Sequence, residues 1–190
     1  MLNIKNRNHI LSEENMNYTQ KASFLFDVIK RYDHYIGTTN YKTALIMSFL
    51  TAVILGLTLR MLNISTGDNS HGIAYYSIAL IVYSTVFASV IVIFHLFRVV
   101  FPDTSNPSTP KSLMFYRDVA NCEDGIKGYF NKVNSTQENE YLKDISSQVF
   151  IVAGIVNEKF RILQLAVNIT KYCVLPLLAI SLLLLIMVEV

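Results

Sequence analysis

Three long runs of uncharged, apolar residues dominate the sequence. They cover residues 43–59, 73–97 and 172–188, and none of them contains an Asp, Glu, Lys or Arg. A helix rises about 1.5 Å per residue and the hydrocarbon layer of a bilayer is about 30 Å thick, so one crossing needs roughly 17 to 25 apolar residues. A buried helix of a soluble protein would normally carry charges on an exposed face. We therefore predict transmembrane helices over residues 43–60, 73–97 and 172–190.

The composition agrees with an all-α membrane protein that has three transmembrane helices and a small helical cytoplasmic domain. Hydrophobic residues make up 52% of the chain and charged residues only 16%, with a mean hydropathy of +0.38. The net charge of +2 is too small to indicate a nucleic acid as a partner. The two cysteines, Cys122 and Cys173, lie in a polar segment and at the edge of a span, so we expect neither a disulfide framework nor a metal site.

The distribution of Lys and Arg predicts the orientation of the chain. Basic residues gather in residues 1–42 and 98–171, whereas the loop over 61–72 has none and only Arg60 lies at its edge. Basic residues near the ends of spans are retained on the cytoplasmic side. We therefore expect the N-terminus and the long middle segment to be cytoplasmic, and the loop over 61–72 and the C-terminus at Val190 to be extracytoplasmic.

Two cytoplasmic stretches have helical periodicity. Apolar residues over 18–36 recur at helical spacing between charged ones, so the segment 1–42 is expected to be a tail followed by an amphipathic helix. A second stripe at steps of three and four begins near residue 138, and nothing before Pro176 would break it. The last span should therefore be continuous with a long cytoplasmic helix. Its apolar stripe could pack against other subunits or against the helix over 18–36 of the same chain, and the sequence leaves both open.

The segment between the second span and this long helix is expected to be mostly irregular. Three of the four prolines fall within 101–110, which indicates a loop. A short apolar and aromatic stretch follows over 113–119. Gly, Asn and Ser then recur through 121–137, and we interpret this stretch as a second loop.

No sequence motif for a nucleotide-binding loop, a dinucleotide fold, a zinc protease, a serine hydrolase or a dithiol site is present, so we predict a protein that is not an enzyme and has no cofactor. Basic and amide side chains do gather where the chain meets the inner face of the membrane. Arg and Lys donors of this kind bind phosphate groups, but anchoring to anionic lipid headgroups is an alternative role. The candidate contacts, for a nucleotide or a lipid headgroup, are Asn40, Lys42, Arg98, Arg117, Lys159 and Arg161.

Several stretches together resemble the membrane effectors of bacterial Pycsar anti-phage systems. The first is DHYIGTTNYKTALIMSFLTAVILGL, which leads into the first span. FRVVFPD and SLMFYRDVAN follow the second span, and YLKDISSQVFIVAGIVNEKFRILQLAV leads into the third. The resemblance covers residues 24–190, with the stretches in the same order and spacing. The positions that match the family pattern are Asp33, Asn40, Lys42, Pro102, Tyr116, Asp118, Gln148 and Lys159.

The resemblance implies a protein of the bacterial inner membrane, in which a cytoplasmic sensor is joined to membrane spans. In this family a partner cyclase makes cyclic UMP or cyclic CMP upon infection, and the effector responds by impairing the inner membrane so that infection is aborted. The expected partners are thus the lipid bilayer, the cyclic mononucleotide and other copies of the chain in a homo-oligomer. An alternative function is a membrane-disrupting or scaffold protein that is restrained by a partner and has no nucleotide ligand.

Overall fold

The computed structural model describes residues 17–67, 72–101 and 112–187, and this part of the chain contains helices but no strand. Three of its helices are long and apolar enough to cross a membrane: those over Tyr18–Ile64, Tyr75–Val100 and Glu138–Met187. The prediction of an all-α membrane protein with three such helices is therefore confirmed. Residues 1–16 of the segment expected as tail and amphipathic helix over 1–42 lie outside the described residues.

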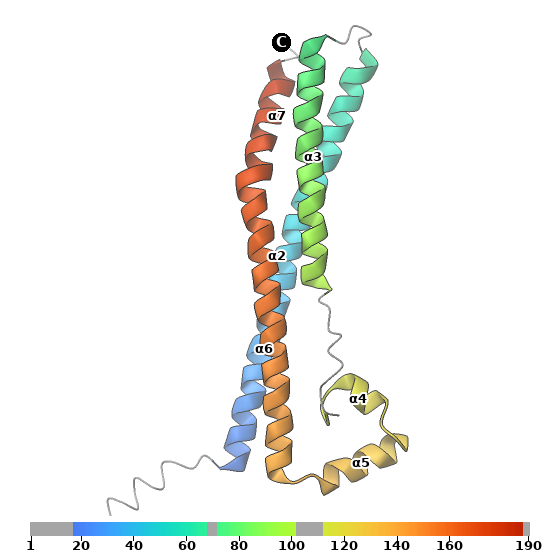
Figure 1. Cartoon of the computed structure of the whole chain (residues 1–190), viewed down its shortest axis with the longest axis vertical. Helices are drawn as coiled ribbons and strands as arrows, with labels where there is room; N and C mark the ends of the chain where they lie inside the picture. Colours follow the sequence, from blue (N-terminus) through green and yellow to red (C-terminus); the bar gives the residue numbers. More distant parts are fainter. Residues whose placement is uncertain (1–16, 68–71, 102–111, 188–190) are drawn as a thin grey trace, which may run out of the picture. The chain divides into compact units, whose positions relative to one another are not determined.

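The first long helix, α2 (Tyr18–Gly67), joins two predicted elements (Figure 1). The amphipathic stretch over 18–36 and the first span form one uninterrupted helix. Gly37 does not interrupt it, since a single glycine costs only about 1 kcal/mol in a helix. Helix α2 also continues through Gly67, so the first part of the loop expected over 61–72 is helical. Helix α3 (Ile73–Val100) contains the second span and extends three residues past its predicted end at 97.

The last span is continuous with the long helix that precedes it, as predicted. Helix α6 (Glu138–Ile169) leads into a short π-helical segment, η1 (Thr170–Val174), and then into α7 (Leu175–Met187). The backbone N–H of Leu175 donates to the carbonyl of Thr170, five residues back. Pro176 explains this local widening, because proline has no N–H and its ring would clash with the carbonyl four residues earlier.

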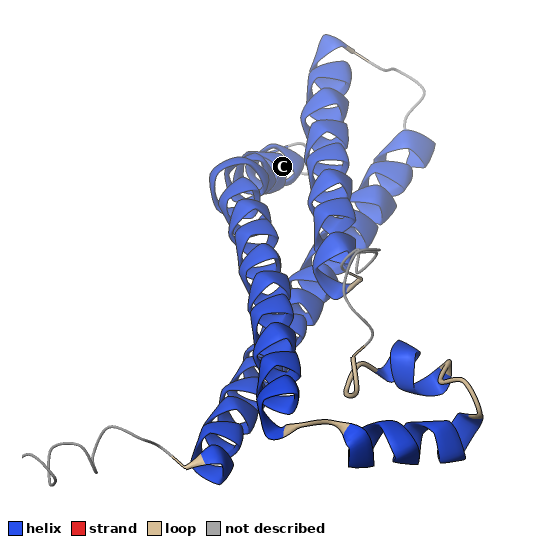
Figure 2. Ribbon diagram, turned by 60° about the horizontal axis from the view of Figure 1, so that its bottom comes forward, coloured by secondary structure: helices blue, strands red, loops and turns tan. Residues whose placement is uncertain are grey.

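The segment over 121–137 is not a loop, and that prediction was wrong. It contains the helix α5 (Gly125–Ser135), and a shorter helix, α4 (Tyr116–Ala120), precedes it; Figure 2 shows both. Apolar side chains at Ile126, Tyr129, Phe130 and Val133 follow helical spacing along α5. None of them is fully buried, but the Tyr129 hydroxyl fixes the helix by donating to the carbonyl of Leu113 at 3.0 Å.

The contacts divide the chain into two units. The first combines the described residues up to His34 with those of 112–155, and Ile145 is fully buried in it. There the rings of Tyr18 and Tyr141 lie 6.4 Å apart, so the start of α6 contacts the N-terminal part of α2 in the same chain. Packing against other subunits stays a prediction.

The second unit contains residues 35–103 and 156–190 and includes the three spans. Helix α3 packs along α7 and η1. The core of this second unit consists of two apolar clusters. One includes Leu50, Val92 and Leu163, and the other includes Leu57, Val82 and Leu185. The hydroxyls of Thr85 and Ser181 pair between α3 and α7 at 2.9 Å. Many large apolar side chains remain exposed on these helices, as expected where lipid covers them.

Candidate functional site

A buried lysine connects three helices in the unit that contains the spans. The Lys159 ammonium on α6 donates a hydrogen bond to Oδ1 of Asn40 on α2 at 3.0 Å. It also donates to the carbonyl oxygen of Val99 on α3. The residue is only 4% exposed, which is rare for a lysine. The three contacting groups hold α2, near the start of the first span, and the end of the second span against α6.

The carbonyl of Val99 is a suitable partner for a cation. Helix α3 ends at Val100, and the last four carbonyls of a helix have no N–H partner within it. This end of the helix also carries a partial negative charge, which a cation stabilises. Lys159 therefore acts as a C-terminal cap for α3 that is supplied by another helix.

Small polar and aromatic side chains surround this contact. Thr39 and Thr43 are buried on α2, and their hydroxyls donate to the carbonyls of Tyr35 and Thr39, respectively, at 2.8 and 2.9 Å. The rings of Tyr35 and Phe160 meet edge to face with centroids 6.5 Å apart. Burial lowers the pKa of the Lys159 ammonium. The two oxygen acceptors compensate for part of the cost of burying the charge.

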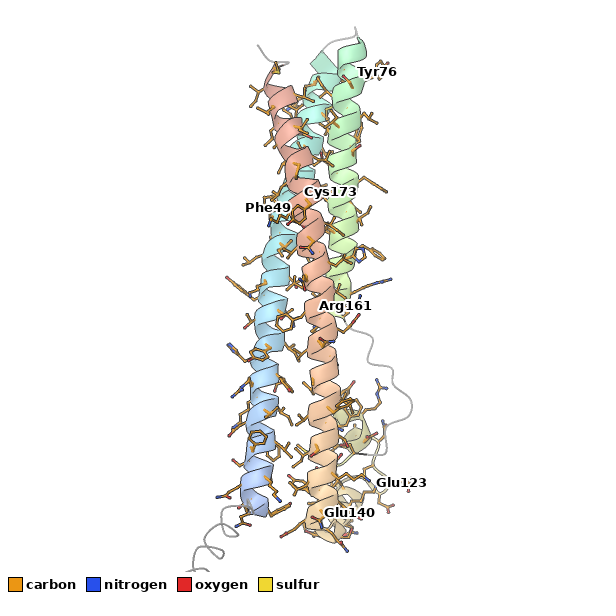
Figure 3. The ribbon with its side chains drawn as sticks, turned by 60° about the vertical axis from the view of Figure 1, so that its left-hand side comes forward. Phe49, Tyr76, Glu123, Glu140, Arg161 and Cys173 are labelled. Carbon is orange, nitrogen blue, oxygen red and sulfur yellow. The ribbon has the colours of Figure 1, made fainter. Side chains whose placement is uncertain are left out.

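The other predicted contacts lie on exposed surfaces. Lys42 is exposed on α2, and Arg98 is exposed in the last turn of α3. Arg161, labelled in Figure 3, forms an exposed ion pair with Glu158 at 2.6 Å, which lowers the pKa of that carboxyl through the hydrogen bond. Arg117 is exposed on α4 in the other unit. Of the six candidates, the structure therefore brings only Asn40 and Lys159 into hydrogen-bonding contact.

Sequence reasoning missed a second set of polar contacts, which lies in the first unit. The backbone N–H of Ser112 donates to Asp118 and that of Leu113 donates to Asp144 on α6, both at 2.8 Å. The carbonyl of Leu113 accepts a hydrogen bond from the Tyr129 hydroxyl on α5 at 3.0 Å. This turn is thus fixed by side chains from three helices. Asp118 lies in one of the stretches that carry the family resemblance, but its spacing gave no sign of a partner.

Comparison with known proteins gives the family. The model of the Pycsar effector protein domain matches residues 24–187. This chain belongs to the Pycsar effector family. The Pycsar effector protein EcPycTM of Escherichia coli is 28% identical over 160 residues, which cover 80% of this chain and 84% of that protein. No solved structure matches the chain.

Membership of the Pycsar effector family makes this chain a membrane effector of anti-phage cyclic-nucleotide signalling. The eight positions that match the family pattern fall into two groups, those that form hydrogen bonds in the structure and those for which no such bond is described. Asn40, Asp118 and Lys159 make the hydrogen bonds described above. Asp33, Lys42 and Tyr116 are exposed, Gln148 is half-buried, and Pro102 lies outside the described residues.

Proposed function

We propose that this protein senses a cyclic pyrimidine mononucleotide, cUMP or cCMP, and then impairs the inner membrane so that infection is aborted. Its similarity to EcPycTM, which is described as a Pycsar effector protein, supports this function. The proposal places the N-terminus and residues 98–171 in the cytoplasm, where a nucleotide made in the cell can reach them. It also includes assembly of several copies of the chain.

The observation that carries the proposal is that two helices belong to both units. Helix α2 enters the first unit with residues 18–34 and the second with residues 35–67. Helix α6 likewise crosses from one unit to the other at Ile155 and continues through η1 into the last span. A helix is stiff because each turn is bonded to the next. A ligand that shifts the cytoplasmic part of either helix would therefore move a span as well.

The exposed cations are the groups that we propose for the nucleotide phosphate. Lys42, Arg98, Arg117 and Arg161 carry accessible donors, and Arg in particular binds a phosphate through two parallel hydrogen bonds. Asn40 and Lys159 bond to each other, so their part in the proposal is to position the part of α2 that carries Lys42 and the end of α3 that carries Arg98. Binding to anionic lipid headgroups is the competing role of the exposed cations.

The proposed mechanism is a population shift. A nucleotide can move the equilibrium between two arrangements only by its difference in affinity for them. The favoured arrangement would expose apolar surface of the cytoplasmic helices to other copies, and the resulting oligomer would disturb the bilayer.

The oligomeric mass of the purified protein tests the proposal. The full-length protein in detergent is measured by size exclusion with light scattering, with saturating cUMP, cCMP or cAMP. We expect the mass to rise with one of the two pyrimidine nucleotides and to stay unchanged with cAMP. An unchanged mass with both pyrimidine nucleotides, together with membrane toxicity in cells without a cyclase, would favour the partner-restrained protein instead.

Binding of labelled nucleotide tests the residues. We expect Arg98→Ala to weaken binding about tenfold, the loss of roughly one charge-assisted hydrogen bond. Lys30→Ala is the matched control, because Lys30 is also an exposed cation on the proposed cytoplasmic side and pairs with Asp27 at 3.7 Å. Equal affinity of both variants and the unaltered protein would remove Arg98 from the site.

A further inference from the structure

An apolar groove runs along the membrane-spanning part of the protein between α2 and α7. Its volume is about 590 Å³, within the range of ligand sites in proteins. The α2 side includes Phe49, Ala52 and Gly56, and leucines of α7 form much of the opposite wall. A side chain at Gly56 would meet no atom within 4 Å, so the small residues leave this floor open.

One end of the groove carries a cation at the level of the lipid headgroups. Arg60 belongs to the lining, and it is the only Lys or Arg between Lys42 and Arg98 in the sequence. Arg60 lies 17 residues after Thr43, the first residue of the predicted span. About 26 Å of helix therefore separate the two residues, close to the thickness of the hydrocarbon layer. Its guanidinium therefore reaches the interface opposite to the one at which α2 enters the membrane.

The other end of the groove lies deep in the hydrocarbon layer. Phe49, labelled in Figure 3, precedes Arg60 by 11 residues, or about 16 Å of helix. The groove thus joins a cationic end at the interface to an apolar end near the middle of the bilayer. A phospholipid has the same distribution of properties, with a phosphate at one end and an acyl chain at the other.

We infer that this groove binds one anionic phospholipid, with its phosphate at Arg60 and an acyl chain extending toward Phe49. The charge of Arg60 complements the phosphate of an anionic headgroup. The described lining includes no Asp or Glu that could hold the ammonium of a zwitterionic headgroup. Arg60 also interacts within its own chain, but its five N–H donors allow it to hold a phosphate in addition.

Tryptophan fluorescence offers a direct test because the chain contains no Trp. Phe49→Trp places a single fluorophore at the deep end of the groove. The full-length variant is reconstituted in phosphatidylcholine vesicles that contain a small fraction of phosphatidylglycerol, and one of the two lipids carries brominated acyl chains that quench the fluorophore. We expect brominated phosphatidylglycerol to quench this Trp about fivefold more effectively per molecule than brominated phosphatidylcholine.

Two controls separate the groove from the general lipid surface. Phe87 on α3 is 67% exposed and does not line the groove. The fluorescence of a Phe87→Trp variant should therefore be quenched by both lipids in proportion to their amounts. Adding Arg60→Gln to the Phe49→Trp variant should abolish the preference for phosphatidylglycerol, and Arg60→Lys should restore most of it, since a lysine keeps the charge.

Equal quenching of the Phe49→Trp variant by the two lipids would overturn the inference, as would a preference that survives Arg60→Gln. Gly56→Leu provides a second measurement by filling the groove, with Ala44→Leu as the control on an exposed part of α2 outside it. Gly56→Leu should abolish retention of phosphatidylglycerol in native mass spectrometry. If it instead lowers the oligomeric mass and leaves lipid retention unchanged, a second copy occupies the groove and the inference is wrong.

Discussion

The Lys159 side chain shows how a cation can serve the fold in a membrane effector. It lies next to the start of the first span and the end of the second, where Asn40 and the Val99 carbonyl accept its hydrogen bonds. The sequence placed Asn40 and Lys159 among the candidates for anion binding, and the structure joins them to each other. That pairing could not be predicted because 119 residues separate them and no spacing rule connects the two helices.

Lys159→Met should lower the free energy of unfolding by about 1–3 kcal/mol, because it leaves the buried Val99 carbonyl without its donor. Methionine has a similar length, so lost volume contributes little. Thermal unfolding of the detergent-solubilised protein, followed by circular dichroism, measures the change. Lys42→Ala, at an exposed position on α2, should stay within about 0.5 kcal/mol. If Lys159→Met and Lys42→Ala change the free energy of unfolding equally, Lys159 does not cap α3.

At the scale of the elements, apolar periodicity predicted the helices well where the stripe is long. The three spans and the helix that begins near residue 138 are of this kind. Helix α5 was missed because its apolar stripe is short and Gly125, Gly128, Asn131 and Asn134 interrupt it. The π-helical segment was missed too, since Pro176 signals a disturbance but not which residues will accommodate it.

Gly128 carries a requirement of α5 that the sequence did not show. A Cβ at this position would lie 1.9 Å from the carbonyl oxygen of Glu123, closer than any allowed contact. Helix α5 begins directly after Asp124, whose φ of 63° turns the chain sharply, and Gly125 also has a positive φ of 56°. The close approach of Glu123 to Gly128 follows from this tight entry.

Gly128→Ala should therefore destabilise the first unit by about 1–3 kcal/mol, since the backbone must move to relieve the clash. Gly154→Ala is the matched control with the opposite sign. Its Cβ meets nothing within 4 Å on an exposed part of α6, so it should stabilise the helix by about 0.5–1 kcal/mol. Limited proteolysis between α4 and α6 and thermal unfolding measure both changes. A neutral or stabilising Gly128→Ala would contradict the packing described for α5.

At the scale of the whole molecule, the distribution of basic residues predicts which parts face the cytoplasm. Lys127→Cys on α5 and Gly72→Cys at the start of α3 are both exposed and test opposite sides of the membrane. In a chain whose two natural cysteines are replaced by Ser, a membrane-impermeant maleimide should label Gly72→Cys in intact spheroplasts. Lys127→Cys should react only after lysis. The reverse pattern would invert the proposed topology and place the nucleotide sensor outside the cell.

Permeability of reconstituted vesicles is the most direct measurement of whether a nucleotide signal in the cytoplasmic part reaches the spans. The full-length protein is incorporated into vesicles loaded with a self-quenched dye, and cUMP, cCMP or cAMP is added. We predict dye release with cUMP or cCMP and none with cAMP or without nucleotide. Vesicles that stay sealed at saturating cUMP and cCMP, with the protein shown to be inserted and folded, would contradict the account.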